Sequence, residues 1–206
     1  MADIDQPQLY LITPTEVDLN IFPNLLQSVL DVADIACLRL SLSTTDETVI
    51  SRTGDRLREI AHERDISIVL DTHQLLAERL GLDGVHLRDN GRGLRKLRAD
   101  MGEDAIIGAH CGTSRHHGMS AGEAGADYVA FGPVRESAIG DGEFAETELF
   151  AWWSEMIEIP VVAEGALSVE DVARLAPVTD FLAIGDEIWS QDDPVAALQT
   201  LISPLR

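Results

Sequence analysis

The segment Ala124–Pro133 reads AGADYVAFGP, and it contains the end of a helix followed by a complete strand. Gly125 is the expected stop of a helix over Ser114–Ala124, because glycine accepts the left-handed backbone that ends many helices. The apolar run Tyr128–Phe131 is continuous rather than alternating. That pattern is typical of a parallel strand whose two faces are both covered. This segment therefore predicts one helix-to-strand unit of an α/β fold.

The same unit recurs along the chain. Apolar runs that predict strands lie at Leu9–Ile12, Ala36–Leu40, Ile66–Leu70, Gly84–Leu87, Ala105–Ala109, Tyr128–Phe131, Pro160–Ala163 and Phe181–Ile184. Segments with helical features separate them, at Asn20–Val32, Asp46–Arg64, Gln74–Leu80, Leu94–Asp100, Ser114–Ala124, Glu146–Ile157, Ser168–Leu175 and Val195–Leu201. Eight strands alternating with eight helices predict a single (β/α)₈ TIM barrel over residues 1–206. A doubly wound open sheet has the same local signature and stays the alternative.

Composition narrows the classes of function. The chain has 206 residues, 45% of them hydrophobic, with a formal net charge of −21. This balance fits a folded domain and argues against a nucleic-acid or membrane partner, since anionic surfaces need a basic footprint. Two cysteines and an N-terminal segment Met1–Asp5 without an apolar stretch predict a reduced, cytoplasmic protein that acts on a small molecule.

Polar side chains follow the apolar runs, at the strand ends where TIM barrels build their sites. They are Arg39, Asp71, His73, Arg88, Asp89, His110, Gly132, Glu164, Gly165 and Asp186. The carboxylates and imidazoles among them suit a divalent metal or a cationic ligand, or they are solvated loop residues. His86 lies inside a strand, and we expect a hydrogen-bonded core histidine. Cys111 and His110 are adjacent on a strand and point to opposite faces, which disfavours a nucleophile–base pair.

A concentration of basic residues follows the fourth strand. Its members are Arg88, Arg92, Arg95, Lys96 and Arg98. Either they clamp an anion together with Arg39, or they form the exposed face of a helix. We expect the exposed face for Arg95, Lys96 and Arg98, and both readings stay open for Arg39 and Arg88.

Four segments resemble one known family. Residues 83–87 (DGVHL), 124–133 (AGADYVAFGP), 159–163 (IPVVA) and 9–13 (LYLIT) are similar to the corresponding segments of thiamine phosphate synthases and their thiazole tautomerase relatives. The resemblance runs in register over almost the whole chain. It implies the barrel fold and a cytoplasmic role in thiamine biosynthesis. It also implies self-association as a homo-oligomer, with Trp152-Trp153 divided between the core and a subunit contact.

The resemblance also implies a reaction. An aminopyrimidine pyrophosphate loses pyrophosphate, and a thiazole phosphate attacks the resulting cation to give thiamine phosphate. On this chain, Arg39 and Arg88 would steady the pyrophosphate, and Asp71 and Asp89 would hold Mg²⁺. Gly132 and Gly165 would line the pocket.

The chain departs from the family pattern where phosphate is handled. Ser41 replaces a lysine, the loop over 137–140 has no lysine, and His110 replaces a serine. Glu164 and Asp186 put carboxylates where the family holds a phosphate. One like-charge contact at ~4 Å costs on the order of 4 kcal/mol at an effective dielectric of ~20.

These departures keep two further interpretations open. The first is a non-catalytic barrel that binds a neutral or cationic thiamine-related ligand. The second is a changed enzyme in which His110 and Glu164 perform acid–base work on a substrate without phosphate.

Overall fold

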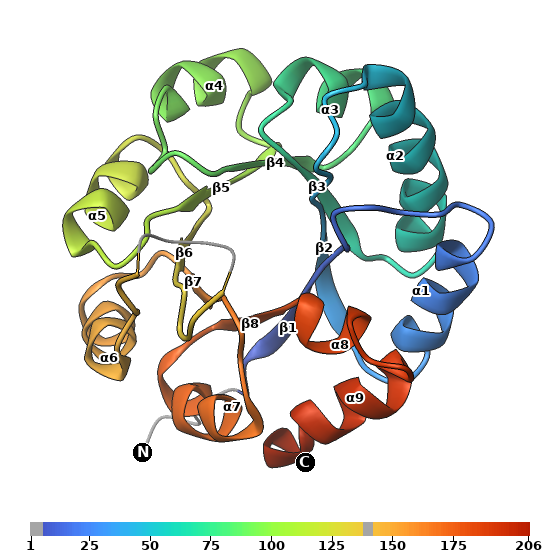
Figure 1. Cartoon of the computed structure of the whole chain (residues 1–206). Coiled ribbons are helices and arrows are strands. Elements are labelled where there is room, and N and C mark those ends of the chain that lie inside the picture. Colours follow the sequence, from blue (N-terminus) through green and yellow to red (C-terminus); the bar gives the residue numbers. More distant parts are fainter. Residues whose placement is uncertain (1–5, 138–141) are drawn as a thin grey trace.

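The computed structural model describes residues 6–137 and 142–206 and has eight parallel strands closed into a barrel (Figure 1). Every strand pairs with its sequence neighbour, and β8 pairs with β1 in the register Tyr10 to Ala183 and Leu11 to Ile184. This closure confirms the TIM barrel and excludes the open sheet. The expectations for Met1–Asp5 and for most of the loop over 137–140 lie outside the described residues.

The elements follow the expected alternation. The strands are β1 Gln8–Ile12, β2 Ile35–Leu40, β3 Ser67–Asp71, β4 Gly84–Leu87, β5 Ile106–His110, β6 Tyr128–Phe131, β7 Val161–Ala163 and β8 Phe181–Ile184. The helices are α1 Phe22–Leu30, α2 Glu47–His62, α3 Gln74–Leu80, α4 Leu94–Met101, α5 Arg115–Glu123, α6 Thr147–Met156, α7 Val169–Leu175, α8 Asp186–Trp189 and α9 Pro194–Leu201. The short helix α8 was not expected, because a single turn has no periodicity to detect. No helix in the described part of the chain is long and apolar enough to cross a membrane.

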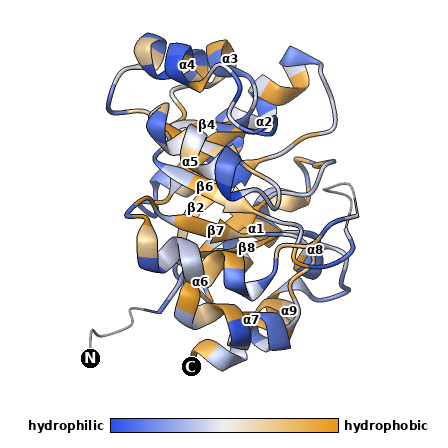
Figure 2. Ribbon diagram, turned by 90° about the vertical axis from the view of Figure 1, so that its left-hand side faces the viewer, coloured by the Kyte–Doolittle hydropathy of each residue, from blue (hydrophilic) through white to orange (hydrophobic). Residues whose placement is uncertain are grey.

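Two separate apolar layers hold the barrel together. The larger layer lies between the strands and the helices and includes Leu38, Val129 and Trp153. The smaller layer lies inside the barrel and includes Tyr10 and Tyr128. Hydropathy colouring shows the hydrophobic strands at the centre and hydrophilic stretches on the outer helices (Figure 2). Because strand side chains alternate between faces, alternate residues of each strand point into the barrel.

The alternation carries polar residues from the barrel interior up to its mouth. On β2 the inward series is Cys37, Arg39 and then Ser41, directly after the strand. Inside β5, Gly108 leaves room for a large neighbour, since a Cβ there would lie 1.9 Å from the ring of Tyr128. The lower interior is therefore filled by aromatic rings, and the charged groups collect above them.

A buried carboxylate ties the loop after β6 to α7. Asp171 accepts hydrogen bonds from Arg135, from Arg174 at 2.7 Å and from the Ser168 backbone N–H at 2.9 Å, and its side chain is only 2% exposed. Burial alone would raise the pKa of Asp171, but the two arginines and Ser168 hold it well below its ordinary range. Arg135 N–H also donates to the Gly165 carbonyl, so this network fixes the β6 loop beside the β7 loop.

We expect Asp171→Asn to lower the free energy of unfolding by about 1–3 kcal/mol at neutral pH, because it removes charge-assisted hydrogen bonds. The carboxylate's folded-state pKa is depressed, so its contribution is complete above about pH 5 and is lost progressively below about pH 4. Urea denaturation at several pH values measures the difference. The matched control is Glu170→Gln, which alters an exposed neighbour and should cost less than about 0.5 kcal/mol. An equal effect of both variants, or a difference independent of pH, would contradict this assignment.

Candidate functional site

A cavity of about 1010 Å³ opens at the carboxyl ends of the strands. Its walls come from the ends of β1 and β2, the loops after β4, β6, β7 and β8, and helix α9. Arg39, Ser41, Arg88, Glu164 and Gly165 all line it. TIM-barrel sites are built on this face, so the cavity is the candidate active site.

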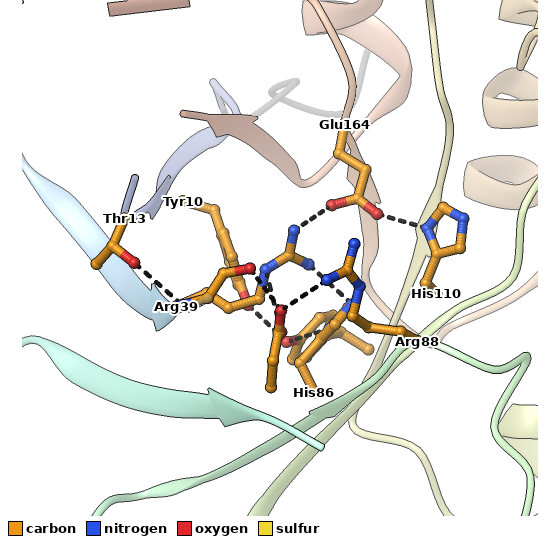
Figure 3. Close-up of polar contacts among 10 residues, drawn as sticks. Tyr10, Thr13, Arg39, His86, Arg88, His110 and Glu164 are labelled. Atoms are coloured by element: carbon orange, nitrogen blue, oxygen red, sulfur yellow. Dashed lines mark hydrogen bonds and ion pairs between the residues drawn. The ribbon is translucent and has the colours of Figure 1, made fainter. Parts of the chain in front are cut away.

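Arg39 lies at the centre of the polar groups below the cavity (Figure 3). The residue is 6% exposed, and its guanidinium donates from Nη2 to Glu164 at 2.7 Å and from Nη1 to His86 at 2.8 Å. Its Nε is 3.6 Å from Asp71 Oδ1, and Tyr10 places its ring under the guanidinium at 5.7 Å. Burial opposes the charge, yet Glu164 raises the pKa of Arg39, which therefore stays protonated.

Glu164 and His110 form a carboxylate–imidazole pair. Glu164 Oε1 lies 2.5 Å from His110 Nδ1, while Oε2 binds Arg39. Burial would raise the pKa of Glu164, but Arg39 and His110 hold it well below its ordinary range. An ionised carboxylate hydrogen-bonded to Nδ1 orients an imidazole. The pair therefore has the chemistry of a general acid or base.

Asp71 is held by hydroxyl and guanidinium groups. Ser41 Oγ donates to Asp71 Oδ2 at 2.6 Å, and Arg88 Nη1 lies 3.7 Å from the same oxygen. Burial raises the pKa of Asp71, and Arg39 opposes that rise. Within the described chain, Asp71 Oδ1 and Arg39 Nε are buried without a hydrogen-bond partner. Thr13 fixes the same corner by accepting a hydrogen bond from the Ser41 backbone N–H at 3.0 Å.

A chain of hydrogen bonds continues from Arg39 into the barrel. Arginine can only donate, so His86 Nε2 accepts and its proton lies on Nδ1. Nδ1 lies 2.9 Å from Tyr128 OH, which in turn lies 2.7 Å from Tyr10 OH. His86 is 1% exposed, which confirms the expected core histidine. Burial, with Arg39 beside the ring, lowers its pKa well below 6.5.

Backbone N–H groups after β7 and β8 converge on one carboxylate. Leu167 N–H donates to Glu187 Oε1 at 3.0 Å, and Gly185 N–H donates to Oε2 at 2.6 Å. Sequence reasoning placed Asp186 at this position, but the structure places the next residue there and leaves Asp186 exposed at the cavity wall. Sequence reasoning also missed Thr13 and the two tyrosines, and it named Ser41 only as the residue that replaces a lysine.

The other expected residues are distributed as follows. Gly132 packs behind Glu164, where a Cβ would lie 2.3 Å from the Glu164 carbonyl. Asp89 is exposed on the loop after β4. Burial raises the pKa of the Cys111 thiol to about 12, which agrees with an inert cysteine. Arg98 is structural, with hydrogen bonds to the carbonyls of Gly125 and Ala105.

The described side chains alone do not form a complete Mg²⁺ site. In the two described stretches, no three metal-binding side chains lie together. Mg²⁺ needs oxygen ligands in octahedral geometry. Asp71 instead faces Ser41 and two guanidinium groups, whose charge would repel a cation. No step below is derived through this ion.

Comparisons with known proteins agree with the fold and identify the family. A family model described as thiamine monophosphate synthase matches residues 9–185. A thiamine-phosphate synthase of Rhodospirillum centenum is 39% identical over 194 residues, which cover 93% of this chain and 94% of that protein. Another, of Erythrobacter litoralis, is 37% identical over 203 residues and 95% of each chain. A solved thiamine phosphate pyrophosphorylase from Pyrococcus furiosus shares the fold, with a TM-score of 0.83 and 20% identity over 98% of this chain and 96% of that one.

Removing the buried guanidinium should destabilise the protein strongly. We expect Arg39→Met to cost about 3–5 kcal/mol, because it leaves the Glu164 charge buried and unpaired. The double variant Arg39→Met/Glu164→Gln should lose less free energy of unfolding than the two single variants lose together, by about 0.5–3 kcal/mol. Urea denaturation measures all three. The exposed pair Arg56 and Glu59 is the control, with coupling below about 1 kcal/mol. Simple additivity at Arg39 and Glu164 would refute the coupling.

The hydrogen-bond directions predict one tautomer for His86. Its proton should lie on Nδ1, and the ring should stay neutral through the pH range in which a free imidazole becomes protonated, because burial lowers its pKa. Nitrogen-15 NMR of the imidazole rings reads both properties, and the spectrum of His86→Gln assigns the signal. A proton on Nε2, or protonation within that pH range, would show that the chain does not run from Arg39 as described.

Proposed function

The chain belongs to the thiamine monophosphate synthase family and has a thiamine-phosphate-synthase-like function in thiamine biosynthesis, and on that premise we propose the reaction that its cavity performs. An aminopyrimidine pyrophosphate and a thiazole phosphate are joined, and pyrophosphate is released. The C–O bond between the pyrimidine methylene and the pyrophosphate breaks. The thiazole nitrogen then donates its electron pair to that methylene carbon, and the product is thiamine phosphate.

The single observation that carries this proposal is the placement of two arginines at the cavity. Negative charge develops on the departing pyrophosphate, and fixed cationic donors stabilise it. The charge of Arg39 is largely neutralised by Glu164 and Asp71. Arg88, by contrast, is half exposed, and its ion pair with Asp71 is long, at 3.7 Å. Arg88 is therefore the group best able to bind the leaving group, with Arg39 behind it.

The acidic residues of the cavity have a role in the same reaction. The pyrimidine methylene becomes cationic when pyrophosphate leaves, and the thiazolium of the product is cationic as well. Glu136, Glu164 and Asp186 all line the cavity. Carboxylates near a developing positive charge stabilise it in a site of low dielectric. The acids that weaken phosphate binding thus favour the cationic intermediate.

The His110–Glu164 pair supports a second candidate function. An imidazole held by a buried carboxylate can move a proton on a ring substrate without any phosphate contact. Exchange of deuterium from solvent into a thiazole would reveal this activity. His110→Asn should abolish the exchange, and exchange that persists in this variant would exclude the pair from proton transfer.

Four finer features belong to the same proposal. We place the protein in the cytoplasm, which two free, buried cysteines support. The net charge of −21 supports small molecules rather than nucleic acid as ligands. Self-association and a Mg²⁺ requirement stay predictions. Trp153 is buried, and half-buried Trp152 packs under Arg115 at 4.6 Å.

Arg88→Met tests the assigned leaving-group contact. Purified protein should form thiamine phosphate from both substrates, and the variant should raise KM for the pyrimidine pyrophosphate about 10–100-fold, as expected for a lost charge-assisted contact. Arg92→Met removes an exposed arginine from the same loop and should change KM less than about twofold. Oxidation of the product to a fluorescent compound gives the rate, with Mg²⁺ and with a chelator in parallel.

Two results would contradict the proposal. Folded protein that forms no thiamine phosphate with or without Mg²⁺ would remove the synthase activity and favour a non-catalytic barrel. An Arg88→Met variant that behaves like Arg92→Met would move the pyrophosphate away from Arg88.

A further inference from the structure

Glu187 occupies backbone donors that face the candidate active site. Both of its carboxylate oxygens are bound, one by Leu167 N–H from the β7 loop and one by Gly185 N–H at the end of β8. Leu167, Gly185 and Glu187 all line the cavity. The carboxylate thus bridges two loops that are adjacent in the barrel but about 20 residues apart in sequence.

These donors are of the type that binds phosphate. In many TIM barrels a phosphate site is formed by the loops after the seventh and eighth strands. Here Gly165 and Ala166 both have positive φ, at 98° and 57°, just before the Leu167 N–H. Successive residues in such conformations turn backbone N–H groups toward a common anion. Here the carboxylate of Glu187 accepts the hydrogen bonds of both donors.

Packing holds Glu187 in this position. Helix α8 is anchored at its last residue, Trp189, whose Nε1 donates to the Ile12 carbonyl at 2.6 Å and whose ring meets Phe22 edge-on at 5.0 Å. In Figure 1, α8 lies inside the ring of the other helices, next to β1 and β8. The backbone of α8 is therefore fixed, and displacement of the carboxylate requires rotation of the Glu187 side chain itself.

We propose that Glu187 determines specificity for the acceptor by competing with its phosphate for the N–H groups of Leu167 and Gly185. This inference rests on the proposed synthase function and concerns the thiazole side of that reaction. A phosphorylated acceptor must either displace Glu187 or place its dianion beside a carboxylate. An acceptor that ends in a neutral hydroxyl meets neither obstacle. Glu187 therefore lowers the ratio of kcat/KM for the phosphorylated acceptor to kcat/KM for the alcohol.

Acceptor competition kinetics test the proposal. We would measure kcat/KM for thiazole phosphate and for the thiazole alcohol, whose products are thiamine phosphate and thiamine. Glu187→Ala should raise the phosphate-to-alcohol ratio about 10–100-fold, because it vacates two donors and removes one charge. Glu187→Gln should give a smaller rise, since its amide keeps only one accepting oxygen. Asp192→Asn removes the same charge from the cavity wall without vacating the donors and should change the ratio less than about threefold.

A binding measurement separates this inference from the proposed function. Titration calorimetry with inorganic phosphate needs no turnover, and Glu187→Ala and Glu187→Gln should each bind phosphate about tenfold or more tightly than the unaltered protein. If no acceptor is turned over but phosphate binding improves, the synthase proposal fails and the competition stands. The competition is refuted if neither Glu187 variant differs from Asp192→Asn in its phosphate affinity or in its acceptor ratio. Glu187→Gln carries the test should Glu187→Ala fail to fold.

Discussion

The ion pair between Arg39 and Glu164 is the interaction on which the mouth of the barrel depends. Both side chains are buried, and Arg39 Nη2 lies 2.7 Å from Glu164 Oε2. A charge at this depth is tolerated only when it is paired and hydrogen-bonded. Arg39 therefore orders the groups around it. It fixes the carboxylate that orients His110, faces Asp71, and sets the tautomer of His86 above the two tyrosines.

The balance of charges at the mouth of the barrel explains how a member of a phosphate-handling family can have an acidic active-site cavity. The acids near Arg39 leave it little net charge for an anion, and Glu187 already fills the backbone donors of the β7 and β8 loops. The half-exposed Arg88 is then the available cation at the cavity. Such a site suits a reaction in which an anion departs and a cation remains, because each charge has a matching partner on a different wall.

Local pattern predicted the barrel because buried parallel strands are continuous apolar runs, and the runs at Gly84–Leu87, Tyr128–Phe131 and Phe181–Ile184 match the strands at both ends. It also placed Arg39 and Glu164 at strand ends. It could not pair them, since 125 residues separate them and their contact exists only after closure. Helix α8 is too short for a periodic signal, so the role of Glu187 was hidden. The expectation that Gly132 contacts the ligand stays a prediction, and the structure adds that its missing Cβ leaves room for Glu164.

The central claim is that two arginines receive the leaving group while Glu187 yields its backbone donors to the acceptor's phosphate. A crystal structure with thiamine phosphate and pyrophosphate bound tests this most directly. We expect pyrophosphate against Arg88, with Arg39 behind it. We also expect the phosphate of thiamine phosphate on the N–H groups of Leu167 and Gly185, with the Glu187 side chain rotated away. Pyrophosphate bound away from both arginines, or phosphate bound elsewhere while Glu187 keeps both hydrogen bonds, would contradict it.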